Sequence, residues 1–177
     1  CVDYAVPILK AHGFRAIFYL VVGLMGKTSE WLAAERGINL HLMDWATARQ
    51  LEADGFECGT HSMSHPRLTD LDVEACRTEL FKSRQQLEDR LDHRVLHMAY
   101  PYGSCNDTVR AMAAECGYQS ACSTRIGLSN IDDDMLDIHR VPVNGQESFF
   151  DFICRLSTAR TVRTKIQKMT EMTLRQL

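Results

Sequence analysis

Apolar and polar positions alternate along the chain in a way that predicts helices and strands in turn. Tyr4, Ile8 and His12 fall near helical spacing and Gly13 follows them, so the chain is expected to open with a helix. The next segment, 15–22 (RAIFYLVV), is almost continuously apolar, as a strand buried on both faces is. The same reasoning predicts helices at 44–55, 72–91 and 107–117, and strands at 56–60, 95–100, 119–123 and 138–143.

Two of these helices begin with an aspartate that can cap the first turn. Asp44 precedes a helix that carries Trp45, Ala48 and Leu51. Asp72 precedes the longest helix, for which one apolar stripe is expected. That stripe consists of Val73, Cys76, Leu80, Leu87 and Leu91.

Strands and helices in alternation, joined by short connections, are typical of βαβ units with a parallel sheet. In such folds the functional residues lie at the carboxyl ends of the strands. The 177 residues, 45% of them hydrophobic, are enough for one domain with a substantial core. The expected fold class is therefore α/β.

The charge balance argues against nucleic acid as a partner. Lys and Arg total 20 against 23 acidic residues, which gives a formal net charge of -3. A membrane-spanning helix needs about 20 apolar residues, and the longest apolar run, 17–24, is only strand-sized. We therefore expect no transmembrane segment in this chain.

Seven cysteines, an odd number without a CxxC pair, favour free thiols in a reducing compartment such as the cytoplasm. The chain begins with Cys1 rather than Met and opens directly into an apolar-periodic segment. This pattern is typical of a fragment whose natural start is missing, so an exported or membrane-associated location stays open.

The last thirty residues, 148–177, differ in composition from the rest. They contain no Pro or Gly and are rich in Arg and Lys, which predicts one or two amphipathic helices. We interpret 1–147 as the folded domain and 148–177 as a basic helical extension that covers it or meets a partner, for example in a homo-oligomer. A basic helix on a membrane surface is the alternative.

Two histidines four residues apart, His61 and His65, follow the predicted strand 56–60. Two imidazole nitrogens at one strand end can bind one divalent metal ion, and Ser62 and Ser64 could orient the rings. An isolated pair of this kind also arises by chance. A structural zinc site that adds Cys58 is a further alternative, although in a strand the Cys58 side chain is expected to point into the core.

The surrounding sequence resembles the polysaccharide deacetylases, the NodB-homology carbohydrate esterases. Residues 61–66 (HSMSHP) match the second motif of that family, H-[ST]-x-x-H-[PS], and residues 100–103 (YPYG) resemble the third, R-x-P-[YF]-G. Segments 5–23 and 127–143 are also similar, so the resemblance covers about residues 3 to 143.

The resemblance implies a distorted (β/α) barrel and a metal-dependent hydrolase that removes acetyl groups from the N-acetylated sugars of a polysaccharide. The metal, usually zinc, is held in the family by an Asp and two histidines, which correspond to His61 and His65. The backbone N–H at the Tyr102 position stabilises the oxyanion, and Tyr100, Pro101 and Tyr102 are expected to bind substrate. His139 falls near the family's last-strand histidine, a general acid, or is a strand-end histidine with local hydrogen bonds.

The chain departs from the family pattern in its first motif, T-F-D-D, which supplies an Asp ligand and the base Asp and is lacking here. Asp3 is expected on the first helix instead, and Ala99 stands where the third motif has Arg. We therefore expect the first barrel strand to be missing, with two of three metal ligands in place. A catalytically inactive relative that binds glycan or acts as a scaffold is the alternative.

Overall fold

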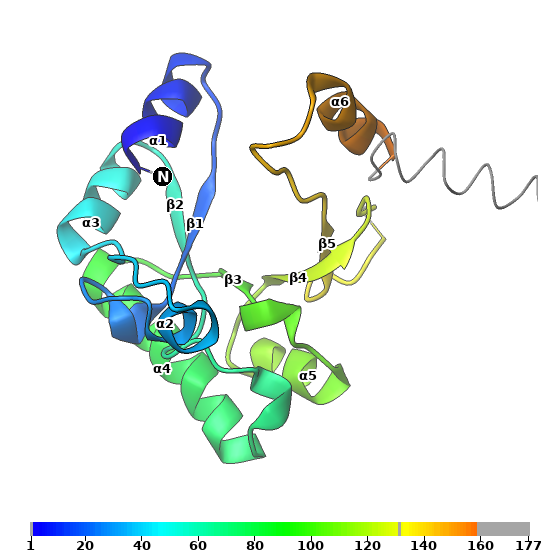
Figure 1. Ribbon diagram of the computed structural model, residues 1–177. Helices are drawn as coiled ribbons and strands as arrows, with labels where there is room; N and C mark the ends of the chain where they lie inside the picture. The colour runs from blue at the N-terminus through cyan, green and yellow to red at the C-terminus, as the bar shows by residue number, and fades with distance from the viewer. Residues whose placement is uncertain (1, 131, 159–177) are drawn as a thin grey trace, which may run out of the picture.

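Five strands form one parallel sheet in a computed structural model that describes residues 2–130 and 132–158. The sheet order follows the chain, and every neighbouring pair is parallel (Figure 1). The predicted α/β fold with a parallel sheet is confirmed. The strands are β1 (Ile17–Leu20), β2 (Glu57–Thr60), β3 (His97–Ala99), β4 (Ser120–Ile126) and β5 (Ile138–Arg140).

The sheet is strongly curved, but it does not close into a barrel over the residues that the structure describes. β1 pairs only with β2 and β5 only with β4 within these ranges, so both are edge strands. In Figure 1 these two strands stand on opposite sides of an opening.

The predicted helices are confirmed, with ends shifted by a few residues. The helix α2 was not predicted, although Ser29 precedes it and Gly37, at φ 65°, ends it. Three short 3₁₀ turns lie at 22–24, 68–70 and 101–103. The α-helices are α1 (Val2–Ala11), α2 (Glu30–Arg36), α3 (Trp45–Ala53), α4 (Val73–Leu91), α5 (Asp107–Glu115) and α6 (Phe149–Thr158).

Both predicted aspartate caps form. The Asp44 carboxylate accepts a hydrogen bond from the Thr47 N–H at 2.8 Å, and the Asp72 carboxylate accepts one from the Ala75 N–H at 2.8 Å. Each bond satisfies an amide that the first helical turn leaves without a partner.

The longest helix of the described residues, α4, spans two core clusters. Leu80 belongs to the cluster built with β3, β4 and α5, while Leu87 belongs to the cluster built with α1, α3, β1 and β2. Cys76 also lies on the buried face of α4, together with Ser83, which the stripe did not include. Val73 is 52% exposed. Including Val73 in the stripe was therefore wrong, because this residue begins the helix ahead of the sheet contact.

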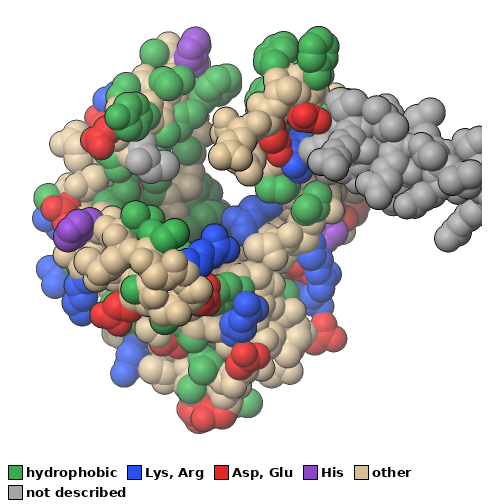
Figure 2. All heavy atoms as spheres, in the orientation of Figure 1, with side chains coloured by type: hydrophobic (Ala, Val, Ile, Leu, Met, Phe, Trp, Pro, Cys, Tyr) green, Lys and Arg blue, Asp and Glu red, His purple; other side chains and the backbone are tan. Residues whose placement is uncertain are grey.

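The cysteines of the described residues are all free thiols, as their count and spacing predicted. Among the described residues, no helix is both long and apolar enough to cross a membrane. α6 lies at the start of the C-terminal extension, and the remainder of that prediction, 159–177, lies outside the described residues. Phe149 and Phe150 of α6 are more than two-thirds exposed, and Figure 2 shows hydrophobic side chains gathered there.

Replacing Leu80 by Ala should lower the free energy of unfolding by roughly 2–5 kcal/mol, because the side chain is fully buried and its removal leaves a cavity. Val73→Ala is the matched control on the same helix and should change stability by less than about 0.5 kcal/mol. Urea denaturation followed by circular dichroism measures both. Equal effects of the two substitutions would contradict the assignment of the buried face.

Candidate metal and catalytic site

The predicted histidine pair lies in the loop that leaves β2 at its carboxyl end. The loop stays beside the end of β1, because the His61 N–H donates to Leu20 O at 2.7 Å and the Val22 N–H donates to Ser62 O at 3.0 Å. A third bond joins the Gly23 N–H to Met63 O at 2.9 Å. Parallel pairing of β1 and β2 thus continues into the loop and sets the backbone position of both histidines.

Gly23 is required for this close approach of the two segments. A Cβ atom added there would lie 2.6 Å from the Met63 carbonyl oxygen, well inside van der Waals contact. A side chain at this position would push the loop away from the end of β1.

His61 is held in one tautomer by the neighbouring strand. Its Nδ1 lies 2.6 Å from the Ala99 carbonyl oxygen, which only accepts hydrogen bonds, so Nδ1 carries the proton and Nε2 keeps a free lone pair. Burial lowers the pKa of His61 to about 4, although the bond to Ala99 acts in the opposite direction. The ring is therefore neutral near pH 7, the form in which imidazole binds a metal ion.

His65 is buried among aromatic rings. It stacks on Trp31 with centroids 4.3 Å apart and an interplanar angle of 19°, and it meets His61 and Tyr102 edge-on at 4.8 and 4.7 Å. Burial also lowers the pKa of His65, so this ring too is neutral.

One ring nitrogen of His65 has no hydrogen-bonding partner among the described residues. Its Nδ1 is buried, and a buried polar atom without a partner costs free energy unless a ligand or ion satisfies it. The buried Nδ1 of His65 and the free Nε2 of His61 can serve as two of the ligands of a divalent ion. No group of three or more potential metal-binding side chains occurs in the described ranges.

Tyr102 places its ring edge-on against His65 from the turn after β3. Its backbone has φ 58°, its hydroxyl donates to the Glu35 carboxylate, and the Arg67 guanidinium lies 4.3 Å from the ring centroid. The structure thus brings together His61, His65 and Tyr102, three of the residues that the sequence predicted for the site.

Two other residues of that turn do not reach the surface. Tyr100 has no exposed area, and its hydroxyl donates to Leu136 O at 2.9 Å, while Pro101 is also fully buried. The expectation that both contact substrate is corrected: Tyr100 continues β3 into the core, and only Tyr102 turns outward.

His139 does not join the histidine pair. No ring contact, hydrogen bond or ion pair links it to His61, His65 or Tyr102 in the part of the chain that the structure describes. Its backbone N–H donates to Ser129 Oγ at 2.9 Å, and its Nδ1 would lie 2.9 Å from a Cβ placed on Gly127. The local alternative, a strand-end histidine, describes this geometry better than a general acid does.

Arg140 is the next residue along β5. Its guanidinium donates to Ser123 O at 2.6 Å, and its charge contributes to the lowered pKa of His61. Neighbouring side chains of a strand point to opposite faces, so one of these two residues has to face away from the site.

Cys58 is excluded as a third ligand by the same alternation. Cys58 lies in β2, and the pairing with β1 continues through His61 three residues later, so their side chains point to opposite faces. The thiol is 2% exposed and points toward Ala48 O of α3 at 3.8 Å, and burial raises its pKa to about 12. The structural zinc site with Cys58 is therefore wrong.

A small cavity of about 240 Å³ adjoins His61. It lies between the end of β1 and Trp31, and its wall is mostly apolar. A larger hollow of about 800 Å³ lies at the amino ends of β1 and β2, the opposite end of the sheet from the histidines.

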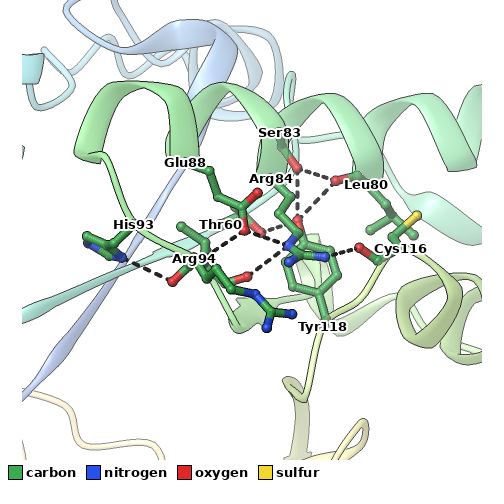
Figure 3. A network of polar contacts seen from close by, with 10 residues as sticks. Thr60, Leu80, Ser83, Arg84, Glu88, His93, Arg94, Cys116 and Tyr118 are labelled. Atoms are coloured by element: carbon green, nitrogen blue, oxygen red, sulfur yellow. Dashed lines mark hydrogen bonds and ion pairs between the residues drawn. The ribbon is translucent and has the colours of Figure 1, made fainter.

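A buried polar network supports β2 directly before His61 (Figure 3). Thr60 Oγ1 donates to the Tyr118 hydroxyl at 2.8 Å, and that hydroxyl donates to Leu80 O of α4 at 3.0 Å. Ser83 of α4 lies within 3.2 Å of the same hydroxyl. These contacts tie the end of β2 to α4 and to the start of β4, so the strand end that carries His61 is rigid.

The sequence reasoning missed several residues around the pair. Trp31 and Glu35 lie on α2, the helix that was not predicted, and Arg140 would have followed from strand alternation if the register of β5 had been known. The residues missed in this way are Trp31, Glu35, Arg67, Glu79 and Arg140.

The sequence model of the polysaccharide deacetylase family matches residues 1–121. Among curated proteins, the chain is similar to the uncharacterized protein YlxY of Bacillus subtilis, with 29% identity over 109 residues, 62% of this chain and 29% of YlxY.

Two solved structures have similar folds. The Streptococcus pyogenes deacetylase PplD, in complex with acetate, matches with TM-score 0.71 and 24% identity over 82% of this chain and 60% of PplD. The Bacillus anthracis protein BA3943, described as a carbohydrate esterase family 4 pseudoenzyme, matches with TM-score 0.52 and 24% identity over 68% of this chain and 37% of BA3943. The chain therefore spans less than two-thirds of each of these proteins.

The metal-free protein should lose stability as the pH falls from 6.5 toward 4, because the unfolded chain binds a proton at His61 in this range and the folded chain does not. The contribution is fully present above pH 6.5 and should amount to about 3 kcal/mol. Urea denaturation at several pH values across this range gives the free energy of unfolding. This free energy should fall less steeply with decreasing pH for His61→Gln than for the parent. Equal slopes would show that His61 titrates alike in both states.

Proposed function

The chain belongs to the polysaccharide deacetylase family, and we propose that it acts as a metal-dependent deacetylase on the N-acetylated sugars of a polysaccharide. The observation that carries the proposal is the pair His61 and His65, two neutral imidazoles in ring contact whose remaining nitrogens are free to bind. The pair lies at the carboxyl ends of parallel strands, which is where folds of this class hold their functional residues.

We assign His61 and His65 as ligands of a divalent ion, with zinc favoured because imidazole suits it. When bound, such an ion polarises the acetyl carbonyl and lowers the pKa of a water molecule that attacks it. The family pattern assigns the third ligand and the base to aspartates of a motif that this chain does not contain.

The other residues of the site position the two histidine rings or stabilise the bound substrate. The Ala99 carbonyl keeps Nε2 of His61 free, and Trp31 holds the His65 ring by stacking. In the proposal, the Tyr102 N–H stabilises the oxyanion and the rings of Tyr102 and Trp31 contact the sugar. The apolar cavity beside His61 suits the acetyl methyl group.

A second function, glycan binding without catalysis, is favoured by one observation. No group of three or more potential metal ligands occurs among the described residues, and BA3943, whose fold is similar, is described as a pseudoenzyme. A protein of this kind could keep the sugar-binding rings while having no base to activate water.

The purified protein should bind one zinc ion, and both His61→Ala and His65→Ala should abolish this binding, since each removes one of two available ligands. His12→Ala is the matched control, because His12 is exposed at the end of α1 and should leave zinc binding unchanged. Isothermal titration calorimetry measures affinity and stoichiometry. Zinc bound equally by all four proteins would contradict the assignment.

With zinc, the protein should release acetate from N-acetylated oligosaccharides, and a chelator should stop the release until zinc is restored. Enzymatic detection of acetate measures the rate, with His65→Ala as the inactive control. Oligosaccharide binding by the zinc-loaded protein without acetate release would favour the non-catalytic function. Absence of both would contradict the two proposals together.

A further inference from the structure

The loop that holds the histidine pair adopts an unfavourable backbone conformation. Ser62 and His65 have φ of 61° and 66°, in the left-handed region that residues with side chains rarely occupy. Residues with a Cβ hold this conformation only where neighbouring groups fix it, so the surrounding structure has to hold the loop in place.

One carboxylate supplies much of this support. Glu79 Oε2 accepts hydrogen bonds from the backbone N–H groups of Met63 at 2.8 Å and Ser64 at 3.0 Å. Its other oxygen accepts from the Ser64 hydroxyl at 2.7 Å. Bonds to an ionised acceptor are about twice as strong as neutral ones, and these three bonds converge on two consecutive loop residues.

The two histidines depend on this support to different degrees. The His61 ring has its own anchor in the hydrogen bond to Ala99 O. The His65 ring has stacking contacts, and its Nδ1 has no hydrogen-bonding partner among the described residues. Its orientation therefore follows the backbone that leads into it, directly after Met63 and Ser64.

We propose that Glu79 is a positioning residue, which sets the orientation of His65 against Trp31 by fixing the loop backbone. This role rests on the proposed function, because His65 is proposed there as a metal ligand. The contacts of Glu79 with the loop do not depend on a bound metal ion. Support of this kind around a metal ligand changes metal affinity by about 10–100-fold.

Glu88 on the same helix is a matched control. Its carboxylate also accepts a backbone N–H bond, from Val95 at 2.9 Å, and a side-chain bond, from Arg84 at 3.0 Å, but it lies in the network of Figure 3 and not at the loop. Glu88→Ala should therefore lose hydrogen bonds of the same kind without touching His65.

The first measurement is the histidine ring signals in NMR spectra of the metal-free protein, assigned with His61→Gln and His65→Gln. Stacking on Trp31 shifts the His65 signals by its ring current, so Glu79→Ala should move them and leave those of His61 in place. Glu79→Gln should restore the parent signals, since an amide can accept from both N–H groups and donate to Ser64. Glu88→Ala should move neither histidine.

Unmoved His65 signals in Glu79→Ala, or equal shifts in Glu88→Ala, would overturn the inference. Should Glu79→Ala fail to fold, Ser64→Ala removes one of the three bonds and should move the His65 signals in the same direction by less. Zinc affinity is the second measurement, expected to fall about 10-fold or more in Glu79→Ala only. If the parent binds no zinc, the proposed function fails, while the NMR result still decides the role of Glu79.

Discussion

The hydrogen bond from His61 Nδ1 to the Ala99 carbonyl is the interaction on which the site depends. It crosses from the end of β2 to the end of β3, and it requires the parallel register that places Thr60 beside Met98. Because a carbonyl oxygen only accepts, the bond selects one tautomer and leaves Nε2 free. A shift of β2 by one residue would turn His61 to the opposite face of the sheet.

The helix α4 supports this arrangement from behind. Leu80 and Leu87 place it in both core clusters, and the turns between them carry polar groups toward β2. The Tyr118 hydroxyl, which accepts from Thr60, donates to the Leu80 carbonyl and lies within hydrogen-bond distance of Ser83. Glu79 accepts a hydrogen bond from the loop that follows β2. The long helix therefore fixes both the strand end before His61 and the loop before His65.

The site gathers residues that belong to separate elements, since Trp31 comes from α2, the histidines from the loop after β2, and Tyr102 from the turn after β3. Parallel strands make this convergence general, because their carboxyl ends lie along one edge. The same geometry explains why the hydrophobic ring contacts and the neutral imidazoles occur together: rings packed on both sides of His65 exclude water and disfavour its charged form.

The sequence by itself determined the five strands, most of the helices and their order. Apolar periodicity predicted the helices and strands, Asp44 and Asp72 marked two helix starts, and the spacing of His61 and His65 marked the loop. These signals are local, since each depends on residues within a turn or a strand. Only the tertiary structure decided which predicted residues meet: it buried Tyr100, kept His139 out of contact with the histidine pair, stacked Trp31 on His65 and brought Glu79 to the loop before it. The reason is that strand register and the packing of helices on the sheet are set by contacts between distant segments, which no local pattern records.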